Sequence, residues 1–319
     1  MLKKEGKFWI VIVIVIALIL AGLCAGYLFI KSKFDKMNFK PLDETDLGIE
    51  LVPEEAQKVN VEDITKFVIF GSDSRDTNNS YAGRSDTIMI VVINNVNKSV
   101  NIISIPRDTY VSVPGYGMTK INHAYAYGQE QLSLKTINSN FGLDIKQYMT
   151  IDFSGLISSI DAVGGVELTL DQEEVDFINS EMTAENKITG PGTVTLNGVQ
   201  ALKHSRNRYV GNDFTRAFRQ RQILISLMKK AVKMDVDEIL ALSDQILVNI
   251  TTNMDMTMYK SMFVQLADDR ELYLQNVNSV QIPSTDYGYS NWQNGIYYFG
   301  FDMDRAKQDF NKYYWGIEQ

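Results

Sequence analysis

The stretch DTIMIVVINNVNKSVNIISI, Asp86–Ile105, predicts two β-strands joined by a tight turn. Its first half, Asp86–Asn94, is long and β-branched, and its second half, Val100–Ile105, alternates between apolar and polar residues. The turn formers Asn94-Asn95-Val96-Asn97 separate the two halves. A third strand, KFVIFG at Lys66–Gly71, precedes them. We therefore expect an antiparallel meander of three strands.

The meander places charged residues from separate parts of the chain at one edge of the sheet. The end of the first strand, the start of the second and the end of the third share that edge, and they carry Asp73, Arg84, Asp86 and Arg107. Charges can gather at strand ends by chance, because strand ends are usually solvated. The mixture of two carboxylates with two guanidinium groups nevertheless favours a site.

The rest of the chain alternates between helical and extended patterns. We expect a helix that ends near Phe141-Gly142, strands at Gln147–Phe153 and Val166–Leu170, and a helix at Ser154–Val163 between them. Residues 171–195 are polar and predict an irregular excursion. Helices follow at about 236–250 and 257–268, then a strand at Val277–Pro283 and a helix from Asp304. This order indicates an α/β domain, a mixed β-sheet covered by helices, with no signal for chemistry in its last third.

A second charged element lies at Asp213–Gln222, DFTRAFRQRQ. In a helix, Asp213, Arg216 and Gln220 fall on one face, and that face continues downstream as Ile223, Leu224, Leu227 and Ala231. Burying charge is costly unless the charge is paired or faces a ligand. The stretch therefore predicts a binding site at the start of an otherwise apolar stripe.

The arginines are clustered although the protein is acidic. Of ten arginines in 319 residues, eight fall in two windows: Arg75, Arg84 and Arg107, then Arg206, Arg208, Arg216, Arg219 and Arg221. The formal net charge of −8 disfavours a general nucleic-acid binder. Salt bridges to surface acids are the alternative for any single arginine. The cluster as a whole indicates recognition of a phosphate or carboxylate, which guanidinium groups bind in bidentate fashion.

The N-terminus predicts a membrane anchor. Residues 8–30 carry no charge over 23 positions, enough for a helix to cross a bilayer core of about 30 Å. A cleaved signal peptide is the alternative, but the run is long and Ala21-Gly22-Leu23-Cys24 is no clean cleavage or lipid-attachment site. We expect a cytoplasmic tail at 1–7, a transmembrane helix at 8–30, a juxtamembrane spacer at 31–60 and one extracytoplasmic domain at 61–319.

Several kinds of chemistry are disfavoured by what the sequence lacks. It contains one cysteine, Cys24, and two histidines, His123 and His204, and the usual hydrolase, nucleotide and zinc-protease motifs are missing. Asp73 and Asp86 offer hard oxygen ligands for Mg²⁺ or Mn²⁺, which would bridge substrate phosphates. The alternative is that these aspartates cap strand ends or form salt bridges with the arginines. The combination fits phosphoryl transfer at a membrane surface.

Six short motifs in a fixed order resemble the LytR-CpsA-Psr family between about residues 66 and 230. They are Gly71-Ser72-Asp73-Ser74-Arg75, Gly83-Arg84-Ser85-Asp86-Thr87, Ser104-Ile105-Pro106-Arg107-Asp108-Thr109, Lys120-Ile121-Asn122, Ser205-Arg206-Asn207-Arg208, and Asp213, Arg216, Arg219 and Gln220 in the helix. A single N-terminal anchor is also typical of this family. His204 departs from the aromatic residue of many relatives.

The resemblance implies a ligase that transfers a phosphate-linked glycopolymer, such as teichoic acid or capsule, from undecaprenyl pyrophosphate to peptidoglycan, forming a phosphodiester outside the cell. It implies Mg²⁺ or Mn²⁺ at Asp73 and Asp86, and a catalytic centre that also includes Arg107 and Asp213. Pyrophosphate binding is implied for a larger set: Arg84, Arg107, Lys120, Arg206, Arg208, Arg216, Arg219 and Gln220. The implied partners are the lipid-linked glycan, peptidoglycan and the membrane, and not nucleic acid.

Two other functions compete with the ligase. A pyrophosphatase that acts on the lipid carrier would use water as the acceptor. A transcriptional attenuator, a role reflected in the family's naming, fits poorly with an exterior part that has 37 acids and 25 bases, about −12. The helix at 213 suggests a further hypothesis, in which pyrophosphate binds Arg216 and Gln220 while the lipid tail follows Ile223, Leu224 and Leu227. Ordinary core packing is the alternative for these three apolar residues.

Overall fold

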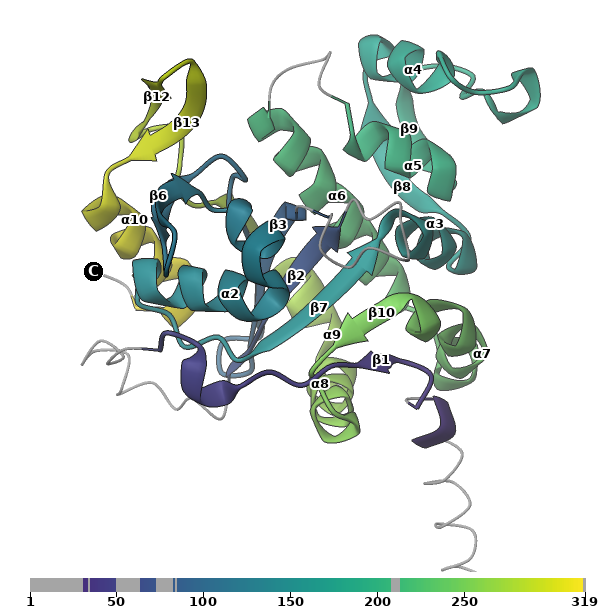
Figure 1. The fold of residues 1–319 in the computed structure, drawn as a ribbon. Helices are drawn as coiled ribbons and strands as arrows, with labels where there is room; N and C mark the ends of the chain where they lie inside the picture. Colours follow the sequence, from purple (N-terminus) through teal and green to yellow (C-terminus); the bar gives the residue numbers. More distant parts are fainter. Residues whose placement is uncertain are drawn as a thin grey trace, which may run out of the picture.

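A seven-stranded mixed β-sheet runs through the middle of the computed structural model, which describes residues 31–33, 35–49, 64–72, 83, 85–207 and 213–317 (Figure 1). The strand order is β1-β10-β7-β2-β3-β4-β11. The strands are β1 (Asn38–Phe39), β10 (Ile250–Thr252), β7 (Gln147–Asp152), β2 (Ile64–Ser72), β3 (Ser85–Asn94), β4 (Ser99–Ser104) and β11 (Val277–Gln281).

The predicted meander forms the centre of this sheet. β2 pairs antiparallel with β3, and β3 pairs antiparallel with β4. The Asn94 side chain closes the turn between β3 and β4, because its Oδ1 accepts from the backbone N–H groups of Val96 at 2.9 Å and Asn97 at 3.2 Å. β7 lies parallel to β2 and β11 lies parallel to β4, so the sheet is mixed, as expected.

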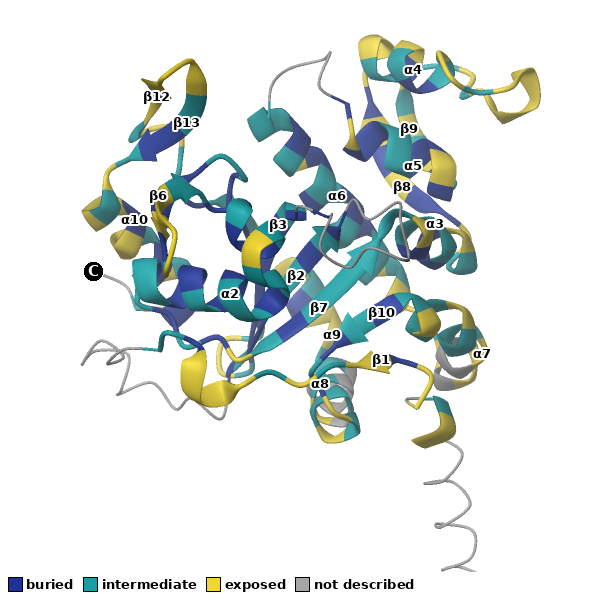
Figure 2. Cartoon of the chain, in the orientation of Figure 1, coloured by how far each residue is buried: buried dark blue, intermediate teal, exposed yellow. Residues whose placement is uncertain are grey.

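Alternation along the central strands sends apolar side chains to both faces of the sheet. Val68, Phe70 and Ile90 pack on one face beneath α2 (His123–Phe141) and α10 (Met303–Phe310). Phe67 and Met89 pack on the other face with α6 (Asp213–Ala231), α8 (Met256–Asp268) and α9 (Arg270–Gln275). Figure 2 shows the central strands as mostly buried, which places the main core on the two faces of the meander.

A smaller unit beside the sheet corrects the prediction for residues 171–195. The hairpin of β8 (Val166–Leu170) and β9 (Gly192–Leu196) packs with α3 (Phe153–Ala162), α4 (Gln172–Asn179) and α5 (Gly198–Ser205). The irregular excursion expected there is wrong, because α4 and β9 lie within it. Asp171 and Glu174 form a capping box that starts α4, and this spacing is a recognisable helix-start signal.

Two further hairpins lie together on the opposite side of the molecule (Figure 1). They are β5 (Tyr110–Val113) with β6 (Gly117–Lys120), and β12 (Gly288–Gln293) with β13 (Ile296–Phe301). The remaining elements are α7 (Val236–Ile246), the 3-10 turns Glu44–Asp46, Ala184–Asn186 and Leu247–Asn249, and a π-turn at Asn311–Trp315.

The N-terminal predictions lie largely outside the described residues. The tail at 1–7 and the anchor at 8–30 belong to that part of the chain, and no helix among the described residues is long and apolar enough to span a bilayer. Part of the segment 31–60, expected as a spacer, packs on the domain: β1 joins the sheet edge and Leu47 is buried in the core. Lys33 and Lys36 pair with Asp244 of α7 at 2.8 and 3.0 Å.

Candidate functional site

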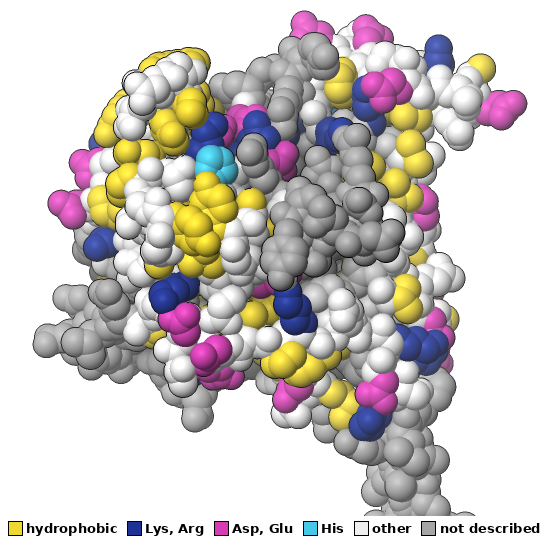
Figure 3. Space-filling view, in the orientation of Figure 1, with side chains coloured by type: hydrophobic (Ala, Val, Ile, Leu, Met, Phe, Trp, Pro, Cys, Tyr) yellow, Lys and Arg dark blue, Asp and Glu magenta, His cyan; other side chains and the backbone are white. Residues whose placement is uncertain are grey.

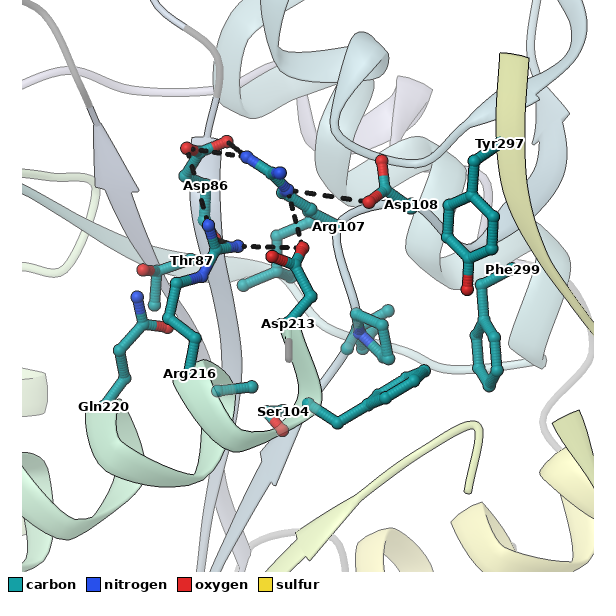
Figure 4. A pocket seen from close by; sticks show the side chains of 15 residues that line it. Asp86, Thr87, Ser104, Arg107, Asp108, Asp213, Arg216, Gln220, Tyr297 and Phe299 are labelled. Carbon is teal, nitrogen blue, oxygen red and sulfur yellow. Dashed lines mark hydrogen bonds and ion pairs between the residues drawn. The ribbon is translucent and has the colours of Figure 1, made fainter. Parts of the chain in front are cut away.

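An ion-pair network joins the edge of the meander to the start of α6 (Figure 4). The Arg107 Nη1 atom lies 3.0 Å from both carboxylate oxygens of Asp86, and the Arg107 Nε atom donates to Asp213 Oδ2 at 2.9 Å. Asp86 lies at the start of β3, Arg107 follows β4, and Asp213 is the first residue of α6. Two of the residues predicted at the sheet edge thus meet the predicted helix.

Arg216 extends this network along α6. Its Nη2 atom lies 3.3 Å from Asp213 Oδ2 and 3.4 Å from the Asp86 carbonyl oxygen. Burial lowers the pKa of Arg107, but the negative charges of Asp86, Asp213 and Asp108 outweigh burial and raise the pKa above its ordinary value. Arg107 therefore stays cationic, and the carboxylates of Asp86 and Asp213 lie close to both guanidinium groups.

Backbone contacts fix the segment that carries Arg107. Ile105 N–H donates to the Ile88 carbonyl at 2.9 Å, which continues the β3–β4 pairing past the last strand residue. The Asn122 N–H then donates to the Arg107 carbonyl at 3.3 Å. Lys120, at the end of β6, pairs with Asp108 Oδ1 at 2.7 Å and does not line the narrow pocket around Arg107. Lys120 therefore lies beside the network, one ion pair away from Arg107.

Aromatic side chains from the C-terminal part of the chain wall this pocket. Tyr297 and Phe299 of β13 line it, and Phe299 packs edge-on against Phe214 of α6 with ring centroids 4.9 Å apart. The expectation of no chemistry signal in the last third missed these two residues. The sequence does signal the hairpin that carries them, because Asn294-Gly295, with φ of 51° and 77°, forms the tight turn between β12 and β13. On the face shown in Figure 3, acidic and basic side chains meet beside this hairpin.

A cavity of about 840 Å³ adjoins the ion-pair network. It lies between α6 and the sheet face formed by β2, β3 and β7, with α3 and the end of α7 at its sides. Its walls are mostly apolar and include the three residues of the predicted lipid groove, Ile223, Leu224 and Leu227, together with Ile69, Met89, Met149, Leu156, Met228 and Ile246. The size is typical of a pocket that encloses a ligand.

The cavity is polar at one end only. Asp86, Arg216 and Gln220 line both this cavity and the narrow pocket, so the two spaces adjoin at these residues. Arg206, the C-cap of α5, lines the same end and lies over the Phe153 ring at 5.0 Å. A long hydrocarbon with a charged head matches this division, because its tail and its head would each find a suitable surface.

Comparison with known proteins identifies the family of the chain. The model of the LytR_cpsA_psr family matches residues 30–313. The chain belongs to this family. It is similar to the polyisoprenyl-teichoic acid–peptidoglycan teichoic acid transferase TagU of Bacillus mycoides, with 31% identity over 315 residues that cover 97% of this chain and 96% of that protein.

Solved structures of the family have the same fold. The chain is similar to TagT bound to LIIa-WTA, with 25% identity and a TM-score of 0.66 over 80% of this chain and 92% of that one. It is also similar to TagV of B. subtilis, with 25% identity and a TM-score of 0.64 over 78% of this chain and 96% of that one. The mixed-sheet α/β domain expected from the sequence is therefore the LytR_cpsA_psr fold.

Arg219 lies apart from the other family-motif residues. It is buried, its Nε atom donates to Glu174 Oε1 of α4 at 2.7 Å, and its Nη1 atom donates to the Asn207 carbonyl at 3.2 Å. Arg219 lines neither the narrow pocket nor the apolar cavity. The structure therefore gives it contacts that hold α4 and the end of the α5 segment against α6. The other predicted residues Asp73, Arg84 and Arg208 lie outside the described residues.

His204 is buried next to the Arg219–Glu174 pair. Its Nδ1 atom makes no hydrogen bond to any described residue. Burial lowers the pKa of His204 to about 4, Arg219 acts in the same direction, and Glu174 and Asp171 oppose it. The imidazole is therefore neutral at pH 7. It lies in the core formed around α5, as expected for a structural histidine rather than a catalytic base.

The buried His204 predicts a loss of stability in acid. Above pH 6.5 the imidazole is neutral in both the folded and the unfolded state, so it contributes no pH dependence. Between pH 6.5 and 4 the unfolded state binds a proton that the folded state does not, and stability falls. From pH 7 to pH 5, urea denaturation should show the free energy of unfolding of the wild type falling by about 2 kcal/mol more than that of His204→Gln. Equal losses in the two proteins would contradict a neutral buried imidazole.

Proposed function

We propose that this protein is a membrane-anchored transferase that moves a phosphate-linked glycopolymer from a polyprenyl pyrophosphate carrier onto peptidoglycan. The observation that carries the proposal is that the arginine-lined pocket and the apolar cavity adjoin along α6, where Arg216 and Gln220 line both. A lipid pyrophosphate joins a hydrocarbon chain to a strong anion, and this site offers a surface for each. The similarity to TagU over nearly the whole chain supports the same reaction.

The roles of the residues follow from their positions. Arg216 and Gln220, at the polar end of the cavity, would bind the pyrophosphate, together with Arg107 and Arg206. Asp213 contacts both Arg107 and Arg216, so it would orient the two guanidinium groups. Arg84, Arg208 and Lys120 complete the proposed set by motif. Guanidinium groups fixed in this way stabilise charge that develops on a phosphoryl group during transfer.

The proposed reaction is a displacement at the phosphorus that carries the glycan. A sugar hydroxyl of peptidoglycan forms a new O–P bond and loses its proton, while the bond from this phosphorus to the bridging oxygen breaks. Polyprenyl monophosphate leaves, and the glycan phosphorus becomes a phosphodiester. Because Arg107 and Arg216 lie on either side of Asp213, each of the two phosphoryl groups joined by the breaking bond would have a cation within reach (Figure 4).

Mg²⁺ or Mn²⁺ would be held by Asp86, with Asp73 as the second ligand implied by the motif. The donor chemistry fits, since Mg²⁺ is commonly bound by one or two carboxylates together with substrate phosphates. Arg107 contacts both oxygens of Asp86, and a carboxylate offers about four lone-pair positions in all. No group of three or more His, Cys, Asp or Glu side chains suited to a metal lies within the described residues. The metal would neutralise charge on the phosphates.

The location follows from the same proposal. An anchor at residues 8–30 would hold the protein in the cell membrane with residues 1–7 in the cytoplasm and the domain outside. Peptidoglycan and the sugar-bearing end of the lipid carrier are both found on that side. The attenuator alternative has no support from the site, because a pocket built from paired arginines beside an apolar cavity suits a lipid anion.

A reconstituted transfer reaction tests the function. The purified protein is incubated with a lipid-pyrophosphate glycan, Mg²⁺ and peptidoglycan, and the wild type should form a phosphodiester between glycan and peptidoglycan. Arg206→Ala should reduce the rate by about tenfold to hundredfold, because it removes a charge-assisted contact to the pyrophosphate. Arg270→Ala, on the surface of α9, is the matched control and should leave the rate unchanged. Release of free glycan phosphate without the phosphodiester would instead assign the protein as a pyrophosphatase.

A further inference from the structure

A second polar cavity, of about 460 Å³, lies next to the arginine-lined pocket. It is bounded by Phe214 and Arg221 of α6, by the loop that follows β11, and by α10. Its walls carry side chains able to form hydrogen bonds: Gln281, Ser284, Thr285, Asp286, Tyr287, Arg305 and Asp309. Its volume falls within the range of ligand pockets, and its polar walls distinguish it from the apolar cavity on the other side of α6, which we call the lipid cavity.

Arg221 is the unusual residue of this cavity. Its side chain is only 5% exposed, and no carboxylate of the described residues lies within ion-pair distance of it. Its Nε atom donates to Ser279 Oγ at 2.9 Å and its Nη1 atom to Ser104 Oγ, while Nη2 bonds to no described residue. Burial alone lowers the pKa of Arg221 to about 10, so the group is still cationic at pH 7. Its guanidinium carbon also lies over the Phe218 ring, 5.8 Å from the centroid, so only neutral groups among the described residues contact this cation. A buried cation without an anionic partner is costly to the fold unless a ligand supplies the anion.

The acids of the cavity do not neutralise Arg221. Asp286 is exposed on the loop, and Asp309 accepts a hydrogen bond from the Tyr287 hydroxyl. Arg305 of α10 is a second cation in the wall and lies over the Tyr287 ring at 5.0 Å. Arg221 is therefore the buried charge of the cavity, whereas Asp286 and Arg305 are exposed and Asp309 is half-buried. An anionic group would enter as far as Arg221.

The geometry of α6 places this cavity beside the arginine-lined pocket proposed to bind the transferring phosphate. Phe214 and Arg221 are seven residues apart and share one face of the helix, whereas Arg216 lies about 140° away from Arg221 around the axis. Phe214 lines both the arginine-lined pocket and this cavity, and Ser104, which accepts from Arg221, also lines that pocket. One helix thus separates the lipid cavity from a polar space that borders the same phosphate pocket.

We propose that this polar cavity is the acceptor subsite, and that Arg221 binds a carboxylate of the peptidoglycan strand. The inference rests on the transferase function proposed above. In phosphoryl transfer the attacking and leaving oxygens lie roughly in line. The lipid cavity receives the leaving polyprenyl phosphate, so the second reactant enters from another side of the pocket. A saccharide with carboxylate substituents matches a cavity that combines hydroxyls, an amide and buried positive charge.

The test measures acceptor and donor binding separately in Arg221→Met, Arg305→Gln and the control Lys307→Gln, an exposed residue of α10 outside the cavity. Arg221→Met should raise the KM for peptidoglycan strands by about tenfold to hundredfold, the loss expected for a charge-assisted hydrogen bond. Arg305→Gln should raise it in the same direction, and Lys307→Gln should not. The KM for the lipid-linked donor should stay within twofold in all three variants.

Calorimetric titration with peptidoglycan strands, without donor, gives a readout independent of turnover. The wild type should bind native strands more tightly than strands whose carboxyl groups are amidated. Its affinity for the amidated strands should be as low as the affinity of Arg221→Met for native strands. Equal binding of native and amidated strands by the wild type overturns the proposal, as does an unchanged acceptor KM in both arginine variants. If the wild type only hydrolyses the donor, the transferase function fails, and the titration still decides whether Arg221 binds a carboxylated glycan.

Discussion

Replacement of Arg107 by alanine is expected to lower the rate of glycan transfer by about 10²–10³-fold, the loss typical of one fixed donor to a transition-state charge. Arg107 joins Asp86 to Asp213 in the structure. The substitution therefore removes one cation. It also leaves the carboxylates of Asp86 and Asp213 without the Arg107 guanidinium, so that they repel the incoming pyrophosphate. The turnover number at saturating donor, measured with purified protein and peptidoglycan, checks this expectation.

Arg107→Lys separates charge from geometry in the same assay. Lysine keeps the positive charge but cannot contact Asp86 and Asp213 at once in the fork arrangement of a guanidinium group. We expect its rate to lie between those of the wild type and Arg107→Ala. A rate of Arg107→Ala within threefold of the wild type, with the fold intact by circular dichroism, would show that Arg107 does not contact the transferring group.

Replacement of Leu224 by glutamate is expected to weaken the binding of polyprenyl phosphate by about a hundredfold or more. Leu224 lines the apolar part of the large cavity, and an ionised carboxylate there costs several kcal/mol when hydrocarbon displaces its water. Binding of a short, water-soluble pyrophosphate should be unchanged, since its contacts lie at the polar end with Arg216 and Gln220. Titration of each ligand in turn measures the two affinities.

Two matched variants make this experiment specific. Leu224→Met conserves apolar character and approximate volume, and it should bind both ligands as the wild type does. Lys229→Glu reverses charge at an exposed position of the same helix and should also bind both. A parallel loss of both ligands in Leu224→Glu would indicate misfolding, and retained polyprenyl binding would assign Ile223, Leu224 and Leu227 to core packing alone.

Short-range sequence patterns predicted the central fold well. The strand–turn–strand pattern at 86–105 became β3 and β4 because β-branched runs and an asparagine-rich turn specify a hairpin without distant contacts. The same reasoning missed β9 and β10, which are short and acquire their partners from distant parts of the chain. Residues 171–195 were predicted to be irregular because the segment is polar and its helix is short. The capping box signals the start of α4, but the apolar face of this helix packs on α5 and its neighbours, which a local pattern does not show.

The part of the charged site that lies at one sheet edge and on one helix face could be predicted from the sequence. Asp86, Arg107, Asp213 and Arg216 are brought together as the meander and the helical period require. The helical periodicity of α6 could not show that the Arg219 side chain, which belongs to the same motif, pairs with Glu174. This pairing depends on the position of α4 in the fold. Nor could it place Tyr297 and Phe299 at the pocket, since a separate hairpin carries them there.

The packing of residues 35–49 on the domain would limit the distance between the site and the bilayer if the proposed anchor holds the protein in the membrane. Lys33 and Lys36 are paired with α7, and β1 is already part of the sheet, so few residues separate the proposed anchor from the domain. A long flexible tether would let a catalytic domain search a deep layer of the wall. With the proposed anchor at residues 8–30, the domain would be held within a thin zone above the membrane. The carrier lipid would then not need to leave the bilayer completely, and only peptidoglycan strands close to the membrane would come within range.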